Sequence, residues 1–551
     1  MKTTKKALSL VLIASMVLSM TACTGGESGN NGGNGGNGGN GGNGGDAANT
    51  SSTTSASFAE AYVPEIDENA ETGVIKYYTY ETNFETASAK LIALFMDRYG
   101  GSFDIQNNVG SLEYASGLGT LIASGDSPDM VRFEQWAFPH GASFNMFTPI
   151  DTYIDLDSDM WKDMKAIADQ YVYNGKHFYV PYKSEPNFVL NYNNRVLEEN
   201  GMPDPMQYVK DGTWDWNKFE EMLKRWQDID PVNHISYNGV GALAFVYTTG
   251  VKPIDVHDGQ IINNLRDPDI NRCMQWIETL RKQYLVGANP DQVASGAPNG
   301  FIHPDSAFQD GNLLFFGMGA LWAYTTSKEA LDKANIPNDI RFVPYPKDPQ
   351  ADKWYQLTNS FGYLIPAGAQ NVKGTVDWMT LIRSEEVDPE NVATAKEKDC
   401  SDTPEYYPIC SNGDCNDTVS PDEKGRHTFS LEENDSGVSV CPSCGTPRKS
   451  KYKVVWDEEI WDLYHELTED GGRFTLLYDY VYGFSNDFKN LFVDNAKDGL
   501  MDSPVFGDLN YANQVEVVYG SVEGYLQPYR DRMAADARGE EVTTTPPETA
   551  A

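Results

Sequence analysis

The chain has 551 residues, of which 40 % are hydrophobic and 12 % aromatic, so it is long enough for more than one domain with a large core. Its 80 acidic and 42 basic residues give a net charge of −38. This charge argues against nucleic acid and anionic lipid surfaces as partners, because both would be repelled.

The N-terminus has the pattern of a targeting segment. Three lysines precede the apolar run 7–20, which is too short to span a bilayer, and small residues lead to Cys23 in "MTAC". This pattern resembles the lipobox of bacterial lipoproteins. The resemblance implies removal of a signal peptide, 1–22, and attachment of acyl chains such as palmitate at Cys23, which would anchor the protein in the membrane. An ordinary secretory peptide with an unrelated cysteine is the alternative.

The following segment, 23–72, is a predicted tether. Its Gly-Gly-Asn repeats and the Ser/Thr-rich stretch after them cannot bury apolar surface, so we expect a disordered coil. A globular body held by this tether would lie at the extracytoplasmic face of the cell membrane.

From Gly73 the pattern becomes that of an α/β protein. The first predicted elements are a strand at 74–78, helices at 82–99 and 111–124, and a strand at 130–133. The polar residues 538–551 form a predicted disordered tail.

The body resembles the extracellular solute-binding proteins of ABC importers, in their family 1-like, carbohydrate-binding type. Six pieces carry the likeness in the family's order: "LIASGDSPDMVRF", "NGKHFYVPYKSEPNFVLNYNNRVLEENG", "GTWDWNKFEEMLKRW", "AFQDGNLLFFGMGALWAY", "IRFVPYPKDP" and "FGYLIPAGAQN". The likeness implies a two-lobed periplasmic-binding-protein-like fold with a hinge of crossing strands. The lobes it implies are 73–186 with 361–472, and 187–360 with 473–537, crossing near 183–186, 357–362 and Gly472.

The resemblance also implies a function. The protein would capture a small solute between its lobes, as a monomer, and deliver it to ABC permease subunits in the membrane. A surface lipoprotein that docks on polysaccharide without a transport role is the alternative, and a glycoside-cleaving enzyme is a more distant one. Peptide, polyol and amino-sugar ligands also stay open.

Catalytic patterns are missing from the sequence. There is no Gly-x-Ser-x-Gly, and the histidine that a His-Glu-x-x-His zinc site would need after His465 is replaced by Glu469. We therefore expect a protein that is not an enzyme.

Aromatic and polar side chains near predicted strand ends are candidates for ligand contact. A sugar offers an apolar face for aromatic stacking and a rim of hydroxyls for Asp, Glu, Asn and Gln. The likeness places Trp322 in the cleft, at the end of the "FGMGALW" strand together with Tyr324, whereas Trp214 and Trp216 are expected to pack inside. Packing is the alternative for every candidate: Tyr80, Glu81, Glu134, Trp136, Tyr182, Tyr247, Trp322, Tyr324 and Asn359.

Five of the seven cysteines fall between 400 and 444, in a polar segment that resembles an insertion, 400–449, in lobe one. "CPSCG" resembles a zinc-ribbon knuckle and "CSNGDC" a looser one. Structural zinc would be held by Cys410, Cys415, Cys441 and Cys444. Disulfides, in an exported protein, and free thiols are the alternatives, and Cys400 is left over from a four-cysteine set.

Overall fold

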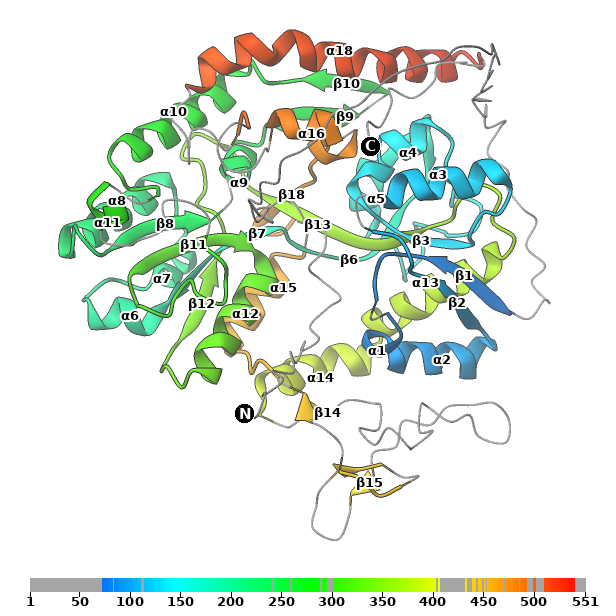
Figure 1. Ribbon diagram of the computed structural model, residues 1–551, viewed down its shortest axis with the longest axis horizontal. Coiled ribbons are helices and arrows are strands. Elements are labelled where there is room, and N and C mark those ends of the chain that lie inside the picture. The colour runs from blue at the N-terminus through cyan, green and yellow to red at the C-terminus, as the bar shows by residue number, and fades with distance from the viewer. Residues whose placement is uncertain are drawn as a thin grey trace, which may run out of the picture.

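The computed structural model describes residues 72–540 except for 83, 111–112, 240–241, 258, 288–289, 295–301, 403–404, 407–431, 434–438, 442–443, 448–449, 452, 470, 485, 493–498 and 502–509. The predicted signal peptide, the predicted lipidation site Cys23, the predicted tether up to 71 and the predicted tail from 541 lie outside these residues. Two separate sheets form the framework of the described part (Figure 1).

The first sheet has the strand order β18-β13-β3-β1-β2, with β6 paired to β13. Strands β1, β2 and β3 are parallel to one another, as expected where strands and helices alternate. Trp378 packs α13 against the first elements of the described chain, because its ring lies 4.8–5.8 Å from the rings of Phe84, Phe95 and Phe103. The elements are β1 (Val74–Tyr78), α1 (Phe84–Ala87), α2 (Ala89–Tyr99), β2 (Ser102–Gln106), α3 (Tyr114–Ser124), β3 (Met130–Arg132), β6 (Val180–Pro186), β13 (Trp354–Leu364), α13 (Val372–Val387) and β18 (Phe474–Leu477).

Short elements cover the region between β3 and β6. They are η1 (Gln135–Ala137), α4 (His140–Ser143), α5 (Lys165–Ala168), η2 (Asp169–Tyr171), β4 (Val172–Tyr173) and β5 (Lys176–His177).

The second sheet has the order β12-β7-β11-β8. Trp214 and Trp216 are buried beside it, as expected, and Trp216 stacks on Trp276 with ring centroids 4.5 Å apart. The elements of this lobe are β7 (Phe188–Asn193), α6 (Asn194–Glu199), α7 (Pro205–Lys210), α8 (Trp216–Ile229), β8 (Ile235–Gly239), α9 (Ala242–Tyr247), β9 (Ile254–His257), β10 (Gln260–Asn263), α10 (Pro268–Lys282), α11 (Pro290–Ala294), β11 (Leu313–Gly319), α12 (Ala320–Lys333) and β12 (Ile340–Val343), of which β9 and β10 form a separate two-stranded sheet.

Two strands connect the sheets. Only Asn187 separates β6 from β7, yet these strands pair in different sheets. The neighbouring crossing is β13, and the two are tied at Asn187, whose N–H donates to Leu357 O at 3.0 Å and whose Oδ1 accepts from Asn359 Nδ2 at 3.0 Å. This arrangement confirms the predicted α/β class with two lobes joined by crossing strands.

Local predictions differ from the structure at two places. The helix expected over 82–99 is interrupted at Ser88, which separates α1 from α2. The strand expected to end with Trp322 and Tyr324 ends at Gly319 instead, so both residues lie on α12. The apolar run in "LLFFGMGALW" fits a buried strand and a buried helix equally well, so its periodicity could not locate the change.

Helix α15 (Glu458–Glu466) belongs with the second sheet, although its residues were assigned to the first lobe. Trp456, just before α15, packs against Tyr324 and Phe342 with ring centroids 4.9 and 6.3 Å away. A crossing to the second lobe therefore precedes α15, and the chain returns to the first sheet between α15 and β18, where Gly472 lies.

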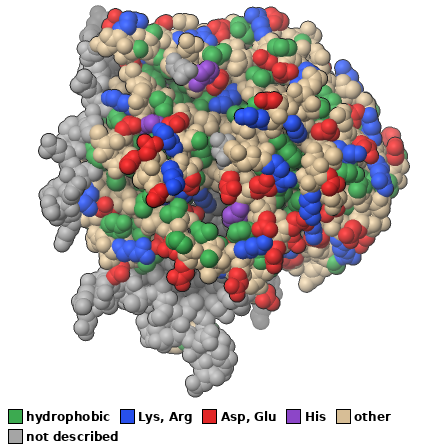
Figure 2. Space-filling model, turned by 180° about the vertical axis from the view of Figure 1, so that it is seen from behind, with side chains coloured by type: hydrophobic (Ala, Val, Ile, Leu, Met, Phe, Trp, Pro, Cys, Tyr) green, Lys and Arg blue, Asp and Glu red, His purple; other side chains and the backbone are tan. Residues whose placement is uncertain are grey.

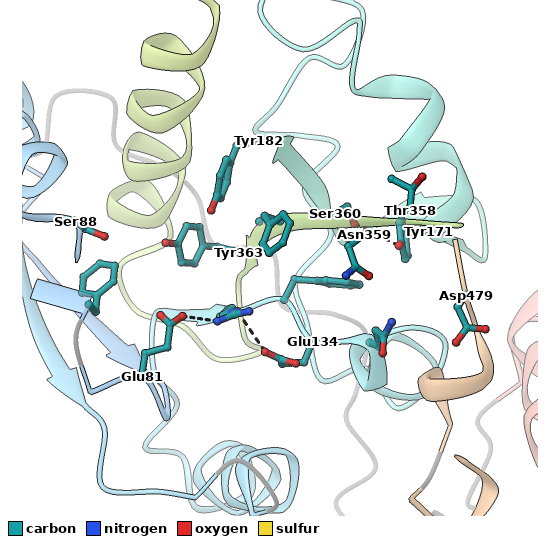
Figure 3. Close-up of a pocket in the computed structure, with 16 residues that line it drawn as sticks. Glu81, Ser88, Glu134, Tyr171, Tyr182, Thr358, Asn359, Ser360, Tyr363 and Asp479 are labelled. Atoms are coloured by element: carbon teal, nitrogen blue, oxygen red, sulfur yellow. Dashed lines mark hydrogen bonds and ion pairs between the residues drawn. The ribbon is translucent and has the colours of Figure 1, made fainter. Parts of the chain in front are cut away.

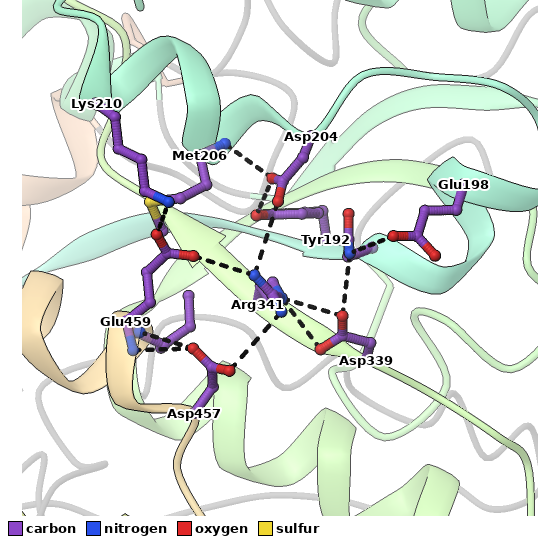
Figure 4. A network of polar contacts seen from close by, with 11 residues as sticks. Tyr192, Glu198, Asp204, Met206, Lys210, Asp339, Arg341, Asp457 and Glu459 are labelled. Atoms are coloured by element: carbon purple, nitrogen blue, oxygen red, sulfur yellow. Dashed lines mark hydrogen bonds and ion pairs between the residues drawn. The ribbon is translucent and has the colours of Figure 1, made fainter.

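Electrostatic contacts also fasten α15 to the second sheet (Figure 4). Arg341 on β12 lies among four carboxylates, at 3.0 Å from Asp339, 3.3 Å from Glu459, 3.7 Å from Asp204 and 3.8 Å from Asp457. Asp457 is also the N-cap of α15, because its side chain accepts hydrogen bonds from Glu459 N and Ile460 N. A single guanidinium thus joins α15 to β12.

The described residues between α13 and α15 form α14 (Pro389–Cys400) and four two-residue strands. These are β14 (Glu405–Tyr406), β15 (Glu432–Glu433), β16 (Ser439–Val440) and β17 (Ser450–Lys451), which pair as β14 with β17 and β15 with β16. They protrude from the two lobes (Figure 1).

The last helix, α18 (Tyr511–Ala537), runs across both lobes (Figure 1). Its first half contacts the second lobe, where Glu516 pairs with Arg266 at 2.7 Å. Its second half reaches the first lobe, where Tyr529 hydrogen-bonds His140 Nδ1 at 2.7 Å and Asp536 accepts from Tyr173 Oη at 2.5 Å. Before it come η3 (Val481–Gly483) and α16 (Asn486–Phe492).

In the part of the chain that the structure describes, no helix combines the length and the apolar character needed to cross a bilayer. On the face that Figure 2 shows, acidic and basic side chains are interspersed.

Candidate solute-binding site

A hollow of about 850 Å³, counted with its open mouth, lies beside the crossing strands (Figure 3). Its walls come from the ends of β1 and β3, from the middle of β13, and from single residues of η2, β6 and the segment after β18. The lining residues are Glu81, Phe84, Ser88, Arg132, Phe133, Glu134, Gln135, Tyr171, Tyr182, Thr358, Asn359, Ser360, Phe361, Gly362, Tyr363 and Asp479.

A charged triad occupies one side of the hollow. The Arg132 guanidinium forms ion pairs with Glu81 and, at 3.3 Å from Nε, with Glu134 (Figure 3). All three side chains are only 11–12 % exposed. Two tyrosines outside the triad add hydrogen bonds, since Tyr77 Oη donates to Glu81 at 3.2 Å and Tyr80 Oη donates to Glu134 at 2.6 Å.

Burial raises the pKa of Glu134, and it does so against the opposing effects of Arg132 and the Tyr80 hydrogen bond. The triad has more negative than positive groups, and its donors fix the carboxylate positions. Such pre-positioned carboxylates can accept hydrogen bonds from hydroxyl or amino groups of a solute.

Aromatic rings form another part of the wall. Tyr182 stacks on Tyr363 with centroids 6.1 Å apart and planes inclined by 26°, and Phe361 is adjacent on β13. Phe133 stacks on the buried Tyr179 at 3.8 Å. Rings held by other rings present rigid apolar faces at little entropic cost.

Strand β13 supplies the polar floor, Thr358 to Gly362. Ser360 Oγ accepts a hydrogen bond from Tyr179 Oη at 3.1 Å, which fixes the hydroxyl. The register slips between Phe361 and Gly362. Gly362 is required there, because a Cβ would lie 2.6 Å from the Tyr179 ring and 2.8 Å from Val180 O.

Asp479 lies farther along the chain than any other residue that lines the hollow. Its Oδ1 accepts hydrogen bonds from Tyr247 Oη at 2.5 Å and Val481 N at 3.1 Å. Burial raises the pKa of Asp479 to about 6, against the lowering effect of these donors and of Lys252. The carboxylate is therefore held rigidly and is poorly solvated.

Four predicted ligand residues line this hollow: Glu81, Glu134, Tyr182 and Asn359. Two others stand directly behind its wall, because Tyr80 donates to Glu134 and Tyr247 donates to Asp479. Trp136 lies on η1, 6.0 Å from both Tyr114 and Phe147, and does not line the hollow.

The two residues on α12 lie elsewhere. Tyr324 is only 1 % exposed and packs in the second lobe against Phe342 and Trp456. Trp322 is partly exposed on the first turn of α12, edge-on to His303 at 5.5 Å, and is not among the lining residues.

Sequence reasoning missed Arg132, Tyr363 and Asp479. Arg132 could have been found, because it ends strand β3 only two residues before the predicted ligand residue Glu134. Tyr363 and Asp479 carry no local signal, because they reach the hollow only through the pairing of β13 with β3 and β18.

Comparison with known proteins identifies the family. A family model described as bacterial extracellular solute-binding protein matches residues 90–395. The chain belongs to the bacterial extracellular solute-binding proteins. Its family is one of non-enzymatic binding proteins, which confirms the expectation that it is not an enzyme. No curated protein sequence matches this solute-binding protein.

Solved structures similar to this solute-binding protein include UgpB from Mycobacterium tuberculosis in complex with glycerophosphocholine. The TM-score is 0.51 at 15 % identity, over 84 % of this chain and 99 % of UgpB, which supports the two-lobed fold. Lmo0181 from Listeria monocytogenes in complex with cycloalternan has a TM-score of 0.49 at 13 % identity, over 85 % and 99 % of the two chains. MalE from Xanthomonas citri has 0.49 at 12 %, over 84 % and 98 %.

Two of the four predicted zinc ligands of this solute-binding protein are described. Cys441 and Cys444 lie in one tight turn, in which Cys441 N donates to Thr446 O at 2.9 Å and Gly445 N donates to Cys441 O at 2.8 Å. Cys410 and Cys415 lie outside the described residues. Two cysteines in one turn, at Cys-x-x-Cys spacing, are what half of a four-cysteine site requires.

Proposed function

We propose that this protein captures a small solute, a sugar or an oligosaccharide, between its two lobes and delivers it to an ABC permease. The observation that carries the proposal is the hollow beside the crossing strands, where stacked tyrosines adjoin fixed carboxylates. Solute that contacts both lobes would favour their closed arrangement, and the crossing strands provide the hinge.

The chemistry of the lining supports a carbohydrate. Tyr182 and Tyr363 offer apolar faces to the C–H groups of a sugar ring, while Glu81, Glu134 and Asn359 offer hydrogen-bond partners to its hydroxyls. A fatty or aromatic ligand would displace water from these polar groups without replacing the hydrogen bonds that the protein leaves open, at a cost for each of about 1–3 kcal/mol.

The proposal includes attachment to the outer face of the cell membrane through acyl chains on Cys23. The tether sequence after Cys23 would let the body move between the medium and a permease. Labelling cells with an alkyne-tagged fatty acid tests this attachment, because a Cys23→Ser variant should lose both the label and the membrane association.

The insertion is proposed to be ordered by one structural zinc ion on Cys410, Cys415, Cys441 and Cys444. When bound, zinc would supply folding energy to a polar segment and no chemistry, since four thiolates leave it no open position.

A ligand screen tests the main proposal. A solute that binds the native state raises the melting temperature by mass action, so mono- and oligosaccharides should be compared with peptides and with glycerophosphocholine. We expect a saturable shift with a member of the sugar set. A shift confined to peptides or glycerophosphocholine would overturn the sugar assignment. Delivery is tested separately: cells that lack the proposed ABC permease should lose uptake of the bound sugar.

A further inference from the structure

The charges that line the hollow do not balance. Three carboxylates, Glu81, Glu134 and Asp479, face it with a single guanidinium, that of Arg132. The guanidinium is already shared between Glu81 and Glu134. Asp479 is therefore without a cation among the lining residues, and the hollow carries excess negative charge.

Two lysines lie close by, and both are engaged elsewhere. Lys252 Nζ is 3.7 Å from Asp255 Oδ1 and 3.1 Å from Gln170 Oε1. Lys183 Nζ lies over the ring of Phe361, 5.4 Å from its centroid. Neither lysine lines the hollow. Their charges reduce the negative potential of the hollow, but neither lysine provides a contact inside the hollow.

Asp479 also has an unused acceptor. Its Oδ1 receives the hydrogen bonds from Tyr247 and Val481, whereas its Oδ2 is buried and has no hydrogen-bond partner among the described residues. The residue is only 7 % exposed. A buried carboxylate oxygen without a donor is costly, and because Asp479 lines the hollow, a small shift of its wall would expose Oδ2 to a donor from the solute.

We propose that the solute of this protein carries a protonated amino group and that Asp479 receives it, which makes Asp479 a specificity-determining residue. This inference rests on the proposed function and narrows its solute class to amino sugars. An ammonium group brings three donors and a positive charge, so it satisfies Oδ2 and offsets the excess negative charge together. A neutral hydroxyl would donate to Oδ2 but would leave the negative charge of the hollow uncompensated, and an anionic solute would be repelled.

Figure 3 indicates how such a solute fits. Glu81 and Asp479 lie on opposite sides of the view, with Glu134 and Asn359 between them. The amino end would meet Asp479, while the hydroxyls of the same solute would meet Asn359 and the triad.

Matched disaccharides test the inference by calorimetry at neutral pH and low salt. The set contains a glucosamine disaccharide, its N-acetylated form, the parent glucose disaccharide and a glucuronate disaccharide. We expect the glucosamine form to bind about tenfold more tightly than the parent and the acetylated form, with the glucuronate form weakest. Equal or tighter binding of the parent or of the anion would overturn the inference.

Variants identify the residue responsible. Asp479→Asn keeps the shape and the Tyr247 contact but removes the charge, and it should abolish the preference for the amino form. Asp352→Asn is the matched control, because Asp352 also accepts a tyrosine hydrogen bond, from Tyr355 at 2.9 Å, on the exposed surface. An Asp479→Asn protein that keeps the preference would contradict the assignment.

Failure of this inference can be told from failure of the proposed function. If the wild type binds the glucose parent best, the sugar-capture proposal stands and the amino group is wrong. If the wild type binds no sugar in the wider screen, the sugar-capture proposal and the amino-group inference are both wrong. Melting temperatures of both variants establish that they are folded, and the ranking by the wild type decides the matter even if Asp479→Asn does not fold.

Discussion

Tyr247 donates a hydrogen bond to Asp479 across 2.5 Å, although 232 positions separate the two residues. The contact joins α9 of the second lobe to the segment after β18, which pairs with the crossing strand β13. A buried carboxylate is thereby fixed at the junction of the lobes, and its titration should be measurable in the stability of the whole protein.

Replacing Asp479 by asparagine should stabilise the protein above pH 6. Burial raises the pKa of Asp479 to about 6 from an ordinary value of 3.8, so the folded state holds its proton more firmly than the unfolded state. The contribution of Asp479 to the free energy of unfolding of the wild type therefore falls as pH rises from about 4 to 6. Asp479→Asn should remove a penalty of about 3 kcal/mol above pH 6.

Urea denaturation between pH 4 and pH 8 measures this effect. The exposed control Asp352→Asn should follow the wild type, and a constant offset between Asp479→Asn and wild type at every pH would refute the titration. The partners that determine the shift are Tyr247, Lys252 and the backbone N–H groups of Val481 and Tyr482.

His140 should contribute the opposite dependence. Burial, followed by repulsion from Arg532, lowers the pKa of His140 to about 4 from 6.5. The unfolded state then binds the proton more readily, so stability is lost as pH falls from about 6.5 to 4, by about 3 kcal/mol. In the wild type this loss and the gain from Asp479 offset each other.

The contribution of His140 to the pH dependence of stability can be measured in the Asp479→Asn variant, where Asp479 no longer offsets it. There, unfolding free energy should fall steeply on acidification, and adding His140→Asn, which keeps an acceptor for Tyr529, should flatten the curve. If both proteins lose stability equally between pH 6.5 and 4, His140 is not the group that titrates.

How much of this site could be predicted depended on distance along the chain. Glu81 and Glu134 were found because they follow predicted strands that turn out to be parallel neighbours, and parallel strands present their ends at one edge. Asp479 and Tyr363 could not be found, since strand pairings over hundreds of residues bring them there. The lobes were predicted from the resemblance, whereas the position of α15 depends on packing of Trp456 that has no sequence signature.

Arg132→Met should destabilise the protein strongly. The change leaves Glu81 and Glu134 buried beside each other without a cation, and breaking a buried ion pair in this way costs about 3–5 kcal/mol. The loss should shrink in acid, because burial raises the pKa of Glu134 and this carboxyl can take up a proton there. Lys76→Ala, which removes an exposed ion pair with Asp126, should cost at most about 1 kcal/mol. Urea titrations at pH 7 and pH 4 compare the variants, and similar losses for both would contradict the buried triad.

The zinc proposal predicts one metal ion per chain in protein purified under reducing conditions. Cys444→Ser should remove it, as should Cys410→Ser, because each deletes one of four thiolates. Cys273→Ser is the control, since Cys273 is buried on α10 in the second lobe. Metal analysis beside thiol titration decides the question: a metal content near zero with few titratable thiols would favour disulfides.

Trp322 is the remaining test of the family resemblance. It lies partly exposed on the first turn of α12 and outside the hollow, so it can contact a solute only when the lobes close. We expect Trp322→Ala to weaken binding of the best sugar about tenfold, through loss of a stacking face, while the melting temperature of the free protein changes little. Trp461→Ala on α15, another partly exposed tryptophan that does not line the hollow, should leave the affinity unchanged. Equal affinities of the wild type and Trp322→Ala, measured by calorimetry, would place the stacking surface on Tyr182 and Tyr363 alone.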